Sequence, residues 1–319
     1  MARRFVNELS EQETLNEIYR AADKQLRANR QGGKYILMKL ADRTGTMTGM
    51  LWNADEKVFE SFERGDYVRC LGRTQLYNGG LQAILTEVTP VPVSEVDIAD
   101  FDRYDASVAD DLEVRLRAVL GSLKNVHLRR LGEAFLADED FVARLKVAPA
   151  AVSNHHAYPG GLLQHTMDLI DLAKAIEPKY PNIDFELVTM GAFLHDLGKI
   201  EELSAAGEAT YTDRGQLVGH IVIGVQILNE KLRSVDDSVD EPMPNTLRWQ
   251  LEHLILSHHG QLEYGSPKIP LSLEAIALHH LDNLDAKLAA TTAVIESDIA
   301  TEGNWTNYNP TMGRKFWKP

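Results

Sequence analysis

The stretch Ala192-Phe193-Leu194-His195-Asp196-Leu197-Gly198-Lys199 ends an apolar run with an imidazole, a carboxylate and an ammonium group. We expect Gly198 to take the left-handed conformation that closes a helix, which would place His195 and Asp196 on the last turn. A neutral imidazole beside a carboxylate is a suitable ligand pair for a divalent transition metal. Lys199 could hold a phosphate group. An ordinary helix terminus would also explain this doublet, so the rest of the chain must decide.

The histidines are concentrated in the second part of the chain. Of 11 histidines, none precedes His127, and ten lie between His155 and His280. Several stand on apolar segments with helical spacing, and helical bundles build dinuclear sites from ligands on several helices. Each histidine taken alone could be a satisfied core or surface residue, but the set fits two metals bridged by one carboxylate. The candidate metal ligands are His165, His195, Asp196, His220, His258, His259 and Asp282.

The first 95 residues have the pattern of a small barrel. Residues 11–30 predict a short helix that ends in a basic cluster, and strands are predicted at 34–40, 46–52, 67–77 and 81–88. Asn78-Gly79 is a strong signal for a two-residue hairpin turn. Short strands joined by such turns within about 70 residues favour a five-stranded barrel of the OB type.

Aromatic and basic residues are interleaved along these strands. Bases of a single strand stack on aromatic rings, and its phosphates pair with Lys and Arg. The candidate nucleic-acid-binding residues of the barrel are Tyr35, Lys39, Arg43, Trp52, Arg69, Arg73 and Tyr77, with Tyr67 as a further aromatic. In the second part, His156 and Tyr158 precede Gly160-Gly161 and could line a pocket for a terminal nucleotide. The alternative is that the barrel aromatics fill the core and that the latter pair packs at a helix entry.

Helical periodicity takes over after the barrel. Pro90-Val91-Pro92 is expected to end the barrel, and the acidic stretch 97–111 is interpreted as a linker. Helices are predicted around 112–123, 131–145 (two helices), 162–176, 185–197, 218–232, 246–259 and 272–299, so the second half should be all-α. The predicted fold class is α+β with two domains: an N-terminal barrel at 1–95, an acidic linker and leading helix at 96–130, and a helical domain at 131–319.

Composition sets limits on the class of protein. At 319 residues, two domains are the default expectation. The single cysteine, Cys70, excludes an internal disulfide and favours a reducing compartment. No signal peptide and no apolar run of membrane-spanning length is evident, so we expect a cytoplasmic protein without a membrane partner.

The net charge of −14 argues against a general polyanion binder. The charge is uneven, however, because residues 1–97 carry 13 Lys and Arg against 14 Asp and Glu. The acidity therefore lies mostly in the part with the histidines, where bound divalent metals would cancel some of it.

The order His, His-Asp, His, His-His, Asp resembles the HD phosphohydrolase superfamily in its dinuclear members. The surrounding sequence is more specific: His156-Ala157-Tyr158-Pro159-Gly160-Gly161-Leu162-Leu163-Gln164-His165-Thr166, Gly191-Ala192-Phe193-Leu194-His195-Asp196-Leu197-Gly198-Lys199-Ile200, Gly219-His220-Ile221, Ser257-His258-His259-Gly260, Tyr264-Gly265-Ser266-Pro267 and Leu281-Asp282-Asn283-Leu284-Asp285-Ala286-Lys287. Together with a preceding OB-type barrel, these motifs are similar to the YhaM-type 3′→5′ exoribonucleases over nearly the whole chain.

The resemblance implies two metal positions that share Asp196. One would be held by His165, His195, Asp196 and Asp282, and the other by Asp196, His220, His258 and His259. Manganese or cobalt would suit such imidazole-rich positions, with magnesium, iron, nickel or zinc as alternatives. Gln164 stands where relatives often have Glu. The ligand near Asp282 is left open, because His279, His280 and Asp285 compete for it.

The implied activity is hydrolysis of single-stranded RNA, and of single-stranded DNA as well, to mononucleotides. Asp196 and Lys199 would be the catalytic residues, and a homo-oligomer is compatible with the family. One alternative is an HD-type phosphohydrolase of a nucleotide or cyclic dinucleotide, with the barrel as an oligomerisation module. The other is a non-catalytic nucleic-acid-binding module whose histidines hold a structural metal. The 3′→5′ polarity comes only from the resemblance.

Overall fold

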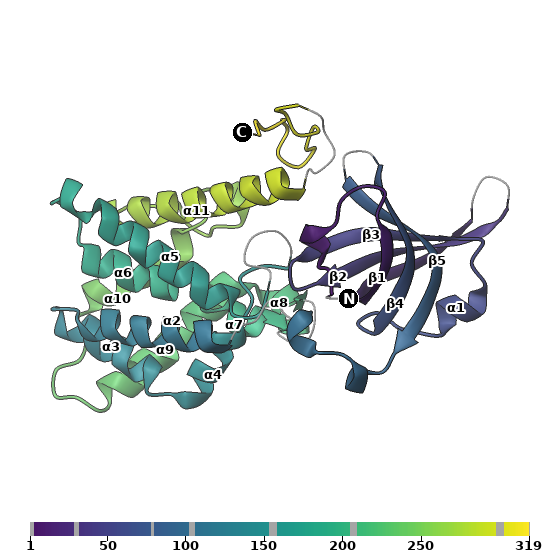
Figure 1. Ribbon diagram of the computed structural model, residues 1–319. Coiled ribbons are helices and arrows are strands. Elements are labelled where there is room, and N and C mark those ends of the chain that lie inside the picture. The colour runs from purple at the N-terminus through teal and green to yellow at the C-terminus, as the bar shows by residue number, and fades with distance from the viewer. Residues whose placement is uncertain are drawn as a thin grey trace. The chain divides into compact units, whose positions relative to one another are not determined.

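The computed structural model describes residues 3–28, 32–77, 80–101, 106–152, 158–204, 209–297 and 303–318 (Figure 1). Contacts within the chain divide it into two compact units, Met1–Arg103 with Thr291–Pro319 and Tyr104–Ala290. The predicted α+β class, with a barrel followed by a helical bundle, is confirmed. The domain boundaries at 1–95, 96–130 and 131–319 stay predictions.

The first unit is built on a closed five-stranded barrel in the order β1-β2-β3-β5-β4. The strands are β1 (Thr14–Ala28), β2 (Lys34–Asp42), β3 (Gly45–Trp52), β4 (Tyr67–Tyr77) and β5 (Gly80–Val91); a 3-10 turn, η1 (Val6–Glu8), precedes them and α1 (Glu56–Glu60) joins β3 to β4. The pairs are antiparallel except β3 with β5, which is parallel. Asn78-Gly79 lies outside the described residues, but Tyr77 pairs with Gly80, which is the register of a two-residue hairpin.

The helix predicted at 11–30 is wrong, because most of this stretch is strand β1. Apolar residues at Leu15, Tyr19 and Leu26 gave a spacing that resembles a helix face. In the barrel, β1 pairs with β4 along its first half and with β2 along its second half, and the register shifts between Ala21 and Asp23. This bulge bends the long strand, and pairing with two neighbours outweighs the local helical pattern.

The second unit is a helical bundle. Its helices are α2 (Ala106–Gly121), α3 (Val126–Leu136), α4 (Glu139–Val147), α5 (Gly161–Ile176), α6 (Phe185–Leu194), α7 (Lys199–Glu202), α8 (Asp213–Val218), α9 (His220–Asp236), α10 (Asn245–Ser257) and α11 (Leu273–Ser297). Short 3-10 turns lie at η4 (Glu177–Lys179) and η5 (Leu262–Tyr264) in this unit, and at η2 (Val93–Glu95) and η3 (Ile98–Asp100) after β5 in the first unit. Among the described residues, no helix is both long and apolar enough to cross a membrane.

The all-α prediction for this half misses a small ribbon. Strands β6 (Leu203–Ser204) and β7 (Thr210–Tyr211) pair in antiparallel fashion directly after α7. The chain leaves α7 in an extended conformation at Leu203, and the Glu202 carbonyl accepts a hydrogen bond from the Thr212 backbone N–H. The ribbon therefore fixes Glu202 at the end of α7.

The acidic stretch 97–111 is not a linker throughout. Helix α2 begins at Ala106, and Ala109 and Leu112 are buried while Asp110 and Asp111 are exposed. The charges thus occupy the solvent face of an amphipathic helix, whose apolar spacing the charge run concealed.

Helix α6 occupies the interior of the bundle. All its residues except Glu186 are buried, including Thr189 and Gly191. A helix that is apolar on every side is surrounded by other helices, and α6 contacts α3, α5 and α10. Groups at its C-terminal end are therefore held in the interior of the unit.

Candidate metal centre

The central His-Asp doublet lies just beyond α6. His195 caps the helix, and its backbone N–H donates to the Gly191 carbonyl at 2.9 Å. The predicted left-handed glycine is wrong, because Gly198 has φ −61° and ψ −20°. Its absent side chain has a different reason: a Cβ there would lie 1.9 Å from the carbonyl oxygen of His220. Only glycine lets this turn pack against the start of α9, which brings Asp196 close to His220.

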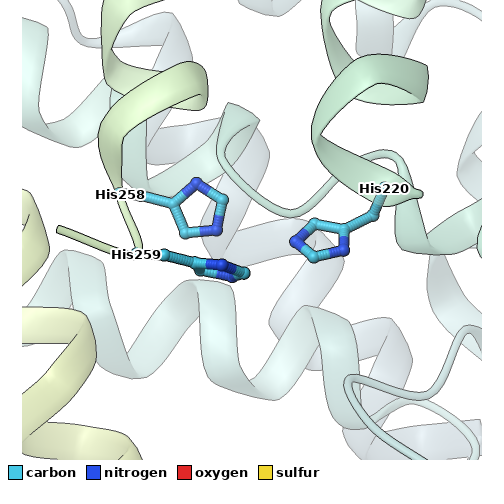
Figure 2. Close-up of side chains that lie close together, drawn as sticks. All are labelled: His220, His258 and His259. Carbon is cyan, nitrogen blue, oxygen red and sulfur yellow. The ribbon is translucent and has the colours of Figure 1, made fainter. Parts of the chain in front are cut away.

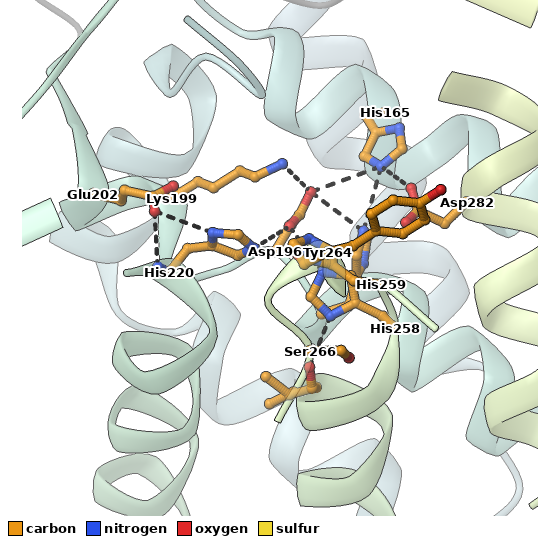
Figure 3. Close-up of polar contacts among 12 residues, drawn as sticks. His165, Asp196, Lys199, Glu202, His220, His258, His259, Tyr264, Ser266 and Asp282 are labelled. Atoms are coloured by element: carbon orange, nitrogen blue, oxygen red, sulfur yellow. Dashed lines mark hydrogen bonds and ion pairs between the residues drawn. The ribbon is translucent and has the colours of Figure 1, made fainter. Parts of the chain in front are cut away.

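One group of candidate ligands gathers on the α5 and α11 side of Asp196. The Nε2 atom of His165, on α5, lies 3.3 Å from Nε2 of His195 and 3.3 Å from Oδ1 of Asp282, on α11. His195 Nε2 is 3.3 Å from Asp196 Oδ2. Figure 3 shows the His165 ring beside Asp196 and Asp282. One ligand atom from each of the three residues His165, His195 and Asp282 lies within 4.8 Å of the others. We call these three residues the first triad.

A second group lies on the α9 and α10 side. His220 opens α9, and His258 and His259 follow the end of α10 (Figure 2). The three rings point toward one another, and their nitrogen ligand atoms also lie within 4.8 Å of one another. Asp196 Oδ1 is 3.5 Å from His220 Nε2 and 3.6 Å from His258 Nε2. We call His220, His258 and His259 the second triad.

Asp196 therefore presents one carboxylate oxygen to each triad. Its side chain is only 4% exposed. Among the described residues, the buried atoms Asp196 Oδ1, His220 Nε2 and His258 Nε2 have no hydrogen-bond partner. Such atoms are costly to bury unpaired, and three of them converge here. A divalent cation would satisfy all three, so the donor set fits a metal.

The other ring nitrogen of each candidate histidine is oriented by a specific acceptor. The Nδ1 contacts are His195 with the Ala192 carbonyl (2.9 Å), His258 with the Ile255 carbonyl (2.7 Å), His259 with the Tyr264 carbonyl (2.8 Å), His220 with Glu202 Oε1 (3.1 Å) and His165 with Asp285 Oδ2 (2.9 Å). An acceptor on Nδ1 holds the proton there and leaves Nε2 free to bind a metal. Four of these imidazoles, those of His165, His195, His220 and His258, place Nε2 within 3.8 Å of an Asp196 oxygen.

Two carboxylates, Asp285 and Glu202, contact the Nδ1 atoms of candidate histidines, a role that the sequence did not assign to either residue. Asp285 was a rival ligand to Asp282, but it lies on Nδ1 of His165, whereas Asp282 lies on Nε2. Glu202 was missed; it accepts from both the backbone N–H (2.9 Å) and Nδ1 of His220. No spacing in the sequence indicates Glu202, since its position depends on the β6–β7 ribbon.

The structure also locates His279, His280 and Gln164 relative to the candidate ligands. The Nδ1 atom of His279 donates a hydrogen bond to the His258 carbonyl at 2.7 Å, and His280 is exposed. Gln164, at the position where relatives often have Glu, donates to Asp168 at 2.8 Å. These contacts place Gln164 and His279 around the triads rather than within them.

Lys199 neutralises the carboxylate shared by the triads. Its Nζ donates to Asp196 Oδ2 at 2.6 Å. Burial alone would raise the pKa of Asp196, but Lys199 and His195 lower it well below its usual range. Burial would likewise lower the pKa of Lys199, yet the Asp196 carboxylate raises it. Both groups are therefore charged, and Asp196 is an ionised ligand.

The two triads differ in protonation. Burial lowers the pKa of His165, but Asp282 and Asp285 raise it more, to about 9. Burial lowers the pKa of His258 well below its usual value, and that of His259 also falls, through burial and the neighbouring His220. His258 and His259 of the second triad are thus neutral imidazoles, while His165 of the first triad holds a proton that a metal must displace.

The predicted nucleic-acid-binding residues fall on two separate faces of the barrel. Tyr35 on β2 pairs with Trp52 on β3, and their ring centroids are 4.8 Å apart at an interplanar angle of 35°. Trp52 is 44% exposed, and Lys39 is exposed further along β2. These aromatics are surface residues rather than core, as stacking on a base would require.

The other group follows the outer face of β4. Arg69, Arg73 and Tyr77 are exposed there, at every fourth residue, and β1 separates this strand from β2. Arg43 lies in the turn after β2 with its guanidinium over the Phe5 ring. Tyr67 packs against Phe101, with ring centroids 4.7 Å apart. The sequence could not show that the residues belong to two faces, because that depends on strand order.

Of the two residues proposed to line a pocket for a terminal nucleotide, the structure describes one. His156 lies outside the described residues. Tyr158 is half-buried just before α5, and its carbonyl accepts from the Gly161 backbone N–H at 3.0 Å.

Comparison with known families agrees with both parts of the chain. Residues 20–91 match the family described as OB-fold nucleic acid binding domain, and residues 162–287 match the HD domain family. The second match runs from α5 to α11 and so includes both triads. Among solved structures, the second OB-fold domain of replication protein A from Methanococcus maripaludis is 21% identical and covers 30% of this chain and 98% of that domain. Its TM-score of 0.24 is too low to support an argument.

Two relatives match along nearly the whole chain. The 3′-5′ exoribonuclease YhaM of Bacillus velezensis (strain DSM 23117 / BGSC 10A6 / LMG 26770 / FZB42) is 32% identical over 317 residues, which is 99% of this chain and 97% of the relative. The protein of the same name from Bacillus subtilis (strain 168) has the same identity and coverage. Because one alignment spans the barrel and the bundle with both triads, the chain belongs to the YhaM family of 3′-5′ exoribonucleases.

Proposed function

We propose that this protein is a two-metal exonuclease that hydrolyses single-stranded RNA, and also single-stranded DNA, from the 3′ end to mononucleotides. The observation that carries this proposal is the Asp196 carboxylate, which turns Oδ2 toward the first triad and Oδ1 toward the second. The polarity and the RNA substrate rest on the names of the relatives.

The two triads would each hold one divalent ion with Asp196 shared between them. The first triad supplies two imidazoles and a carboxylate, and the second supplies three imidazoles. We propose manganese or cobalt, because imidazole-rich positions suit these ions better than magnesium. When bound, such a pair supplies a water activated at neutral pH and neutralises charge on a phosphate.

The chain itself supplies positioning and charge. The outer acceptors keep each imidazole in one tautomer, so the Nε2 atoms stay aimed at the same space. Lys199 lies 2.6 Å from Asp196 Oδ2 with 18% of its side chain exposed. Its ammonium can therefore turn to a non-bridging phosphate oxygen once Asp196 is neutralised by cations.

The barrel gives a reason to favour a polymer over a small nucleotide. Trp52, which is 44% exposed, the half-buried Tyr35 packed against it and Lys39 further along β2 offer rings and charge that a mononucleotide would not need. We therefore favour an exonuclease over an HD-type phosphohydrolase of a cyclic dinucleotide.

The test uses metal-depleted protein with single-stranded RNA labelled at either end. Adding manganese or cobalt should release the 3′ label as a mononucleotide at once and shorten the 5′-labelled strand progressively. Turnover of a cyclic dinucleotide with intact RNA would instead establish the small-molecule alternative. Full activity in rigorously purified magnesium alone would contradict the proposed metals.

A further inference from the structure

The last described segment folds into a hairpin of its own. The Thr306 backbone N–H donates to the Phe316 carbonyl at 2.8 Å, and the Lys318 N–H donates to the Asn304 carbonyl at 2.8 Å. Trp305 pairs with Trp317 in antiparallel fashion, and Thr306, 1% exposed, also accepts from the Phe316 N–H. We call residues 303–318 the C-terminal hairpin; it is the yellow loop that ends the chain in Figure 1.

The hairpin presents large aromatic rings to solvent. Trp305, Tyr308 and Trp317 are 55%, 58% and 53% exposed. The two tryptophan rings meet edge to face, with centroids 5.5 Å apart and an interplanar angle of 82°. More than half of each of these three side chains is exposed, and large aromatic surface exposed on a short element is typical of a binding surface.

The charge of the hairpin is opposite to that of the rest of the chain. Residues 303–318 contain Arg314, Lys315 and Lys318 and no Asp or Glu, whereas the rest of the chain has 30 Lys and Arg against 47 Asp and Glu. Arg314 and Lys315 are exposed. A locally basic surface on a strongly acidic protein selects a negatively charged partner.

We propose that the C-terminal hairpin is a second contact for single-stranded nucleic acid, formed by residues other than those of the barrel strands and the two triads. Bases stack on the rings of Trp305, Tyr308 and Trp317, and Arg314 and Lys315 pair with phosphates. Rings interleaved with cations, in a segment whose sequence contains no Asp or Glu, suit a single strand better than a protein surface, since every base offers a ring face and every nucleotide a charge. The inference rests on the proposed exonuclease function and extends it to a second contact with the substrate.

The test measures the affinity of the full-length chain for a fluorescent single-stranded RNA in the presence of a chelator, so that nothing is cleaved. Trp305→Leu keeps an apolar side chain but no large ring, and it should weaken binding about tenfold. Trp305→Phe should recover most of the affinity. Trp249→Leu is the matched control, because Trp249 is 63% exposed on α10, and it should bind like the unmodified protein.

A charge variant tests the hairpin while leaving its aromatic rings in place. Arg314→Gln with Lys315→Gln should weaken binding and reduce the slope of log affinity against log salt by about 1.4, the value for two lost phosphate contacts. The control is Lys174→Gln with Lys179→Gln, two exposed lysines of the helical unit. An equal loss in both double variants would mean a general field effect and would overturn the proposal.

Two further outcomes are distinguishable. If Trp305→Leu changes the molecular mass in solution but not the RNA affinity, the hairpin is a self-association surface and the proposal is wrong. If the unmodified protein binds RNA but hydrolyses none of it with manganese, the proposed function is wrong. The RNA affinities of the hairpin variants and their controls still test the hairpin proposal in that case.

Discussion

Asp285 Oδ2 lies 2.9 Å from Nδ1 of His165, while Asp282, one turn earlier on α11, places Oδ1 3.3 Å from Nε2 of the same ring. One helix thus supplies both a candidate ligand and the group that orients its neighbour. This arrangement separates two carboxylates that look equivalent in the sequence.

We expect Asp285→Ala and Asp282→Ala to differ in kind. Loss of the orienting carboxylate should weaken metal affinity about 10–100-fold, with the maximal rate recovered at high metal concentration. Loss of the ligand Asp282 should reduce the rate at every metal concentration. Titration of activity with manganese distinguishes the two, and identical titration curves would contradict the assignment.

Asp196→Asn should abolish hydrolysis while leaving RNA binding nearly unchanged. The amide carries no charge to hold two dications close together, and it is a weaker ligand. We expect the rate to fall by several orders of magnitude and the metal content of the purified protein to fall with it. Asp171→Asn, a carboxylate paired with Arg115 on the surface, is the control. Retention of two metals and near-normal activity would return Asp196 to a structural role.

Glu202→Ala should weaken one metal position and spare the other. Glu202 orients His220 of the second triad and has no contact with the first triad among those we find in the described residues. Calorimetric titration with manganese should therefore show one of two binding events weakened about 10–100-fold. Glu201→Ala, the adjacent residue paired with Arg214, should leave both events unchanged. Equal weakening of both events would argue that the triads are not independent.

Metal affinity should rise with pH because of His165. Its pKa in the metal-free protein is about 9, so at neutral pH a metal must displace a proton. We expect the affinity of the first triad to increase by up to tenfold for each pH unit up to about 9.

The stability of the metal-free protein should change in the opposite sense. A group whose pKa is raised from 6.5 to about 9 on folding stabilises the fold fully below pH 6.5 and loses that contribution as the pH rises through 9. Melting temperatures of the metal-free protein measured across this range check the sign. For the preceding prediction on metal binding, a metal affinity that does not change with pH over this range would show that His165 is not a ligand.

Trp52→Leu should raise KM and leave kcat nearly unchanged. The ring is 44% exposed beside Tyr35, and stacking is worth about 1–3 kcal/mol per base, which corresponds to roughly 5–150-fold in affinity. The steady-state kinetics of RNA hydrolysis give both constants. A fall in kcat alone would mean that Trp52 affects the chemistry rather than the hold on the strand.

The sequence alone predicted the two-part architecture and indicated candidate ligands that the structure brings close together. Local patterns carry this information: helical apolar spacing marked α5 and α10, alternating strands with a hairpin signal marked β4 and β5, and short motifs marked His165 and Asp196. Each of these patterns is evident from the sequence because it depends only on residues a few positions apart.

Only the tertiary structure decided what depends on distant partners. Residues 14–28 form a strand because β2 and β4 pair with them, although their own spacing resembles a helix. Glu202 meets His220 because a ribbon and a close turn at Gly198 hold the two segments together. Asp285 and Asp282 have different roles because they lie on successive turns of α11. Asp285 meets Nδ1 of His165, whereas Asp282 meets Nε2 of the same ring. These contacts join residues up to 120 positions apart, and no local pattern encodes which nitrogen of an imidazole a remote carboxylate will reach.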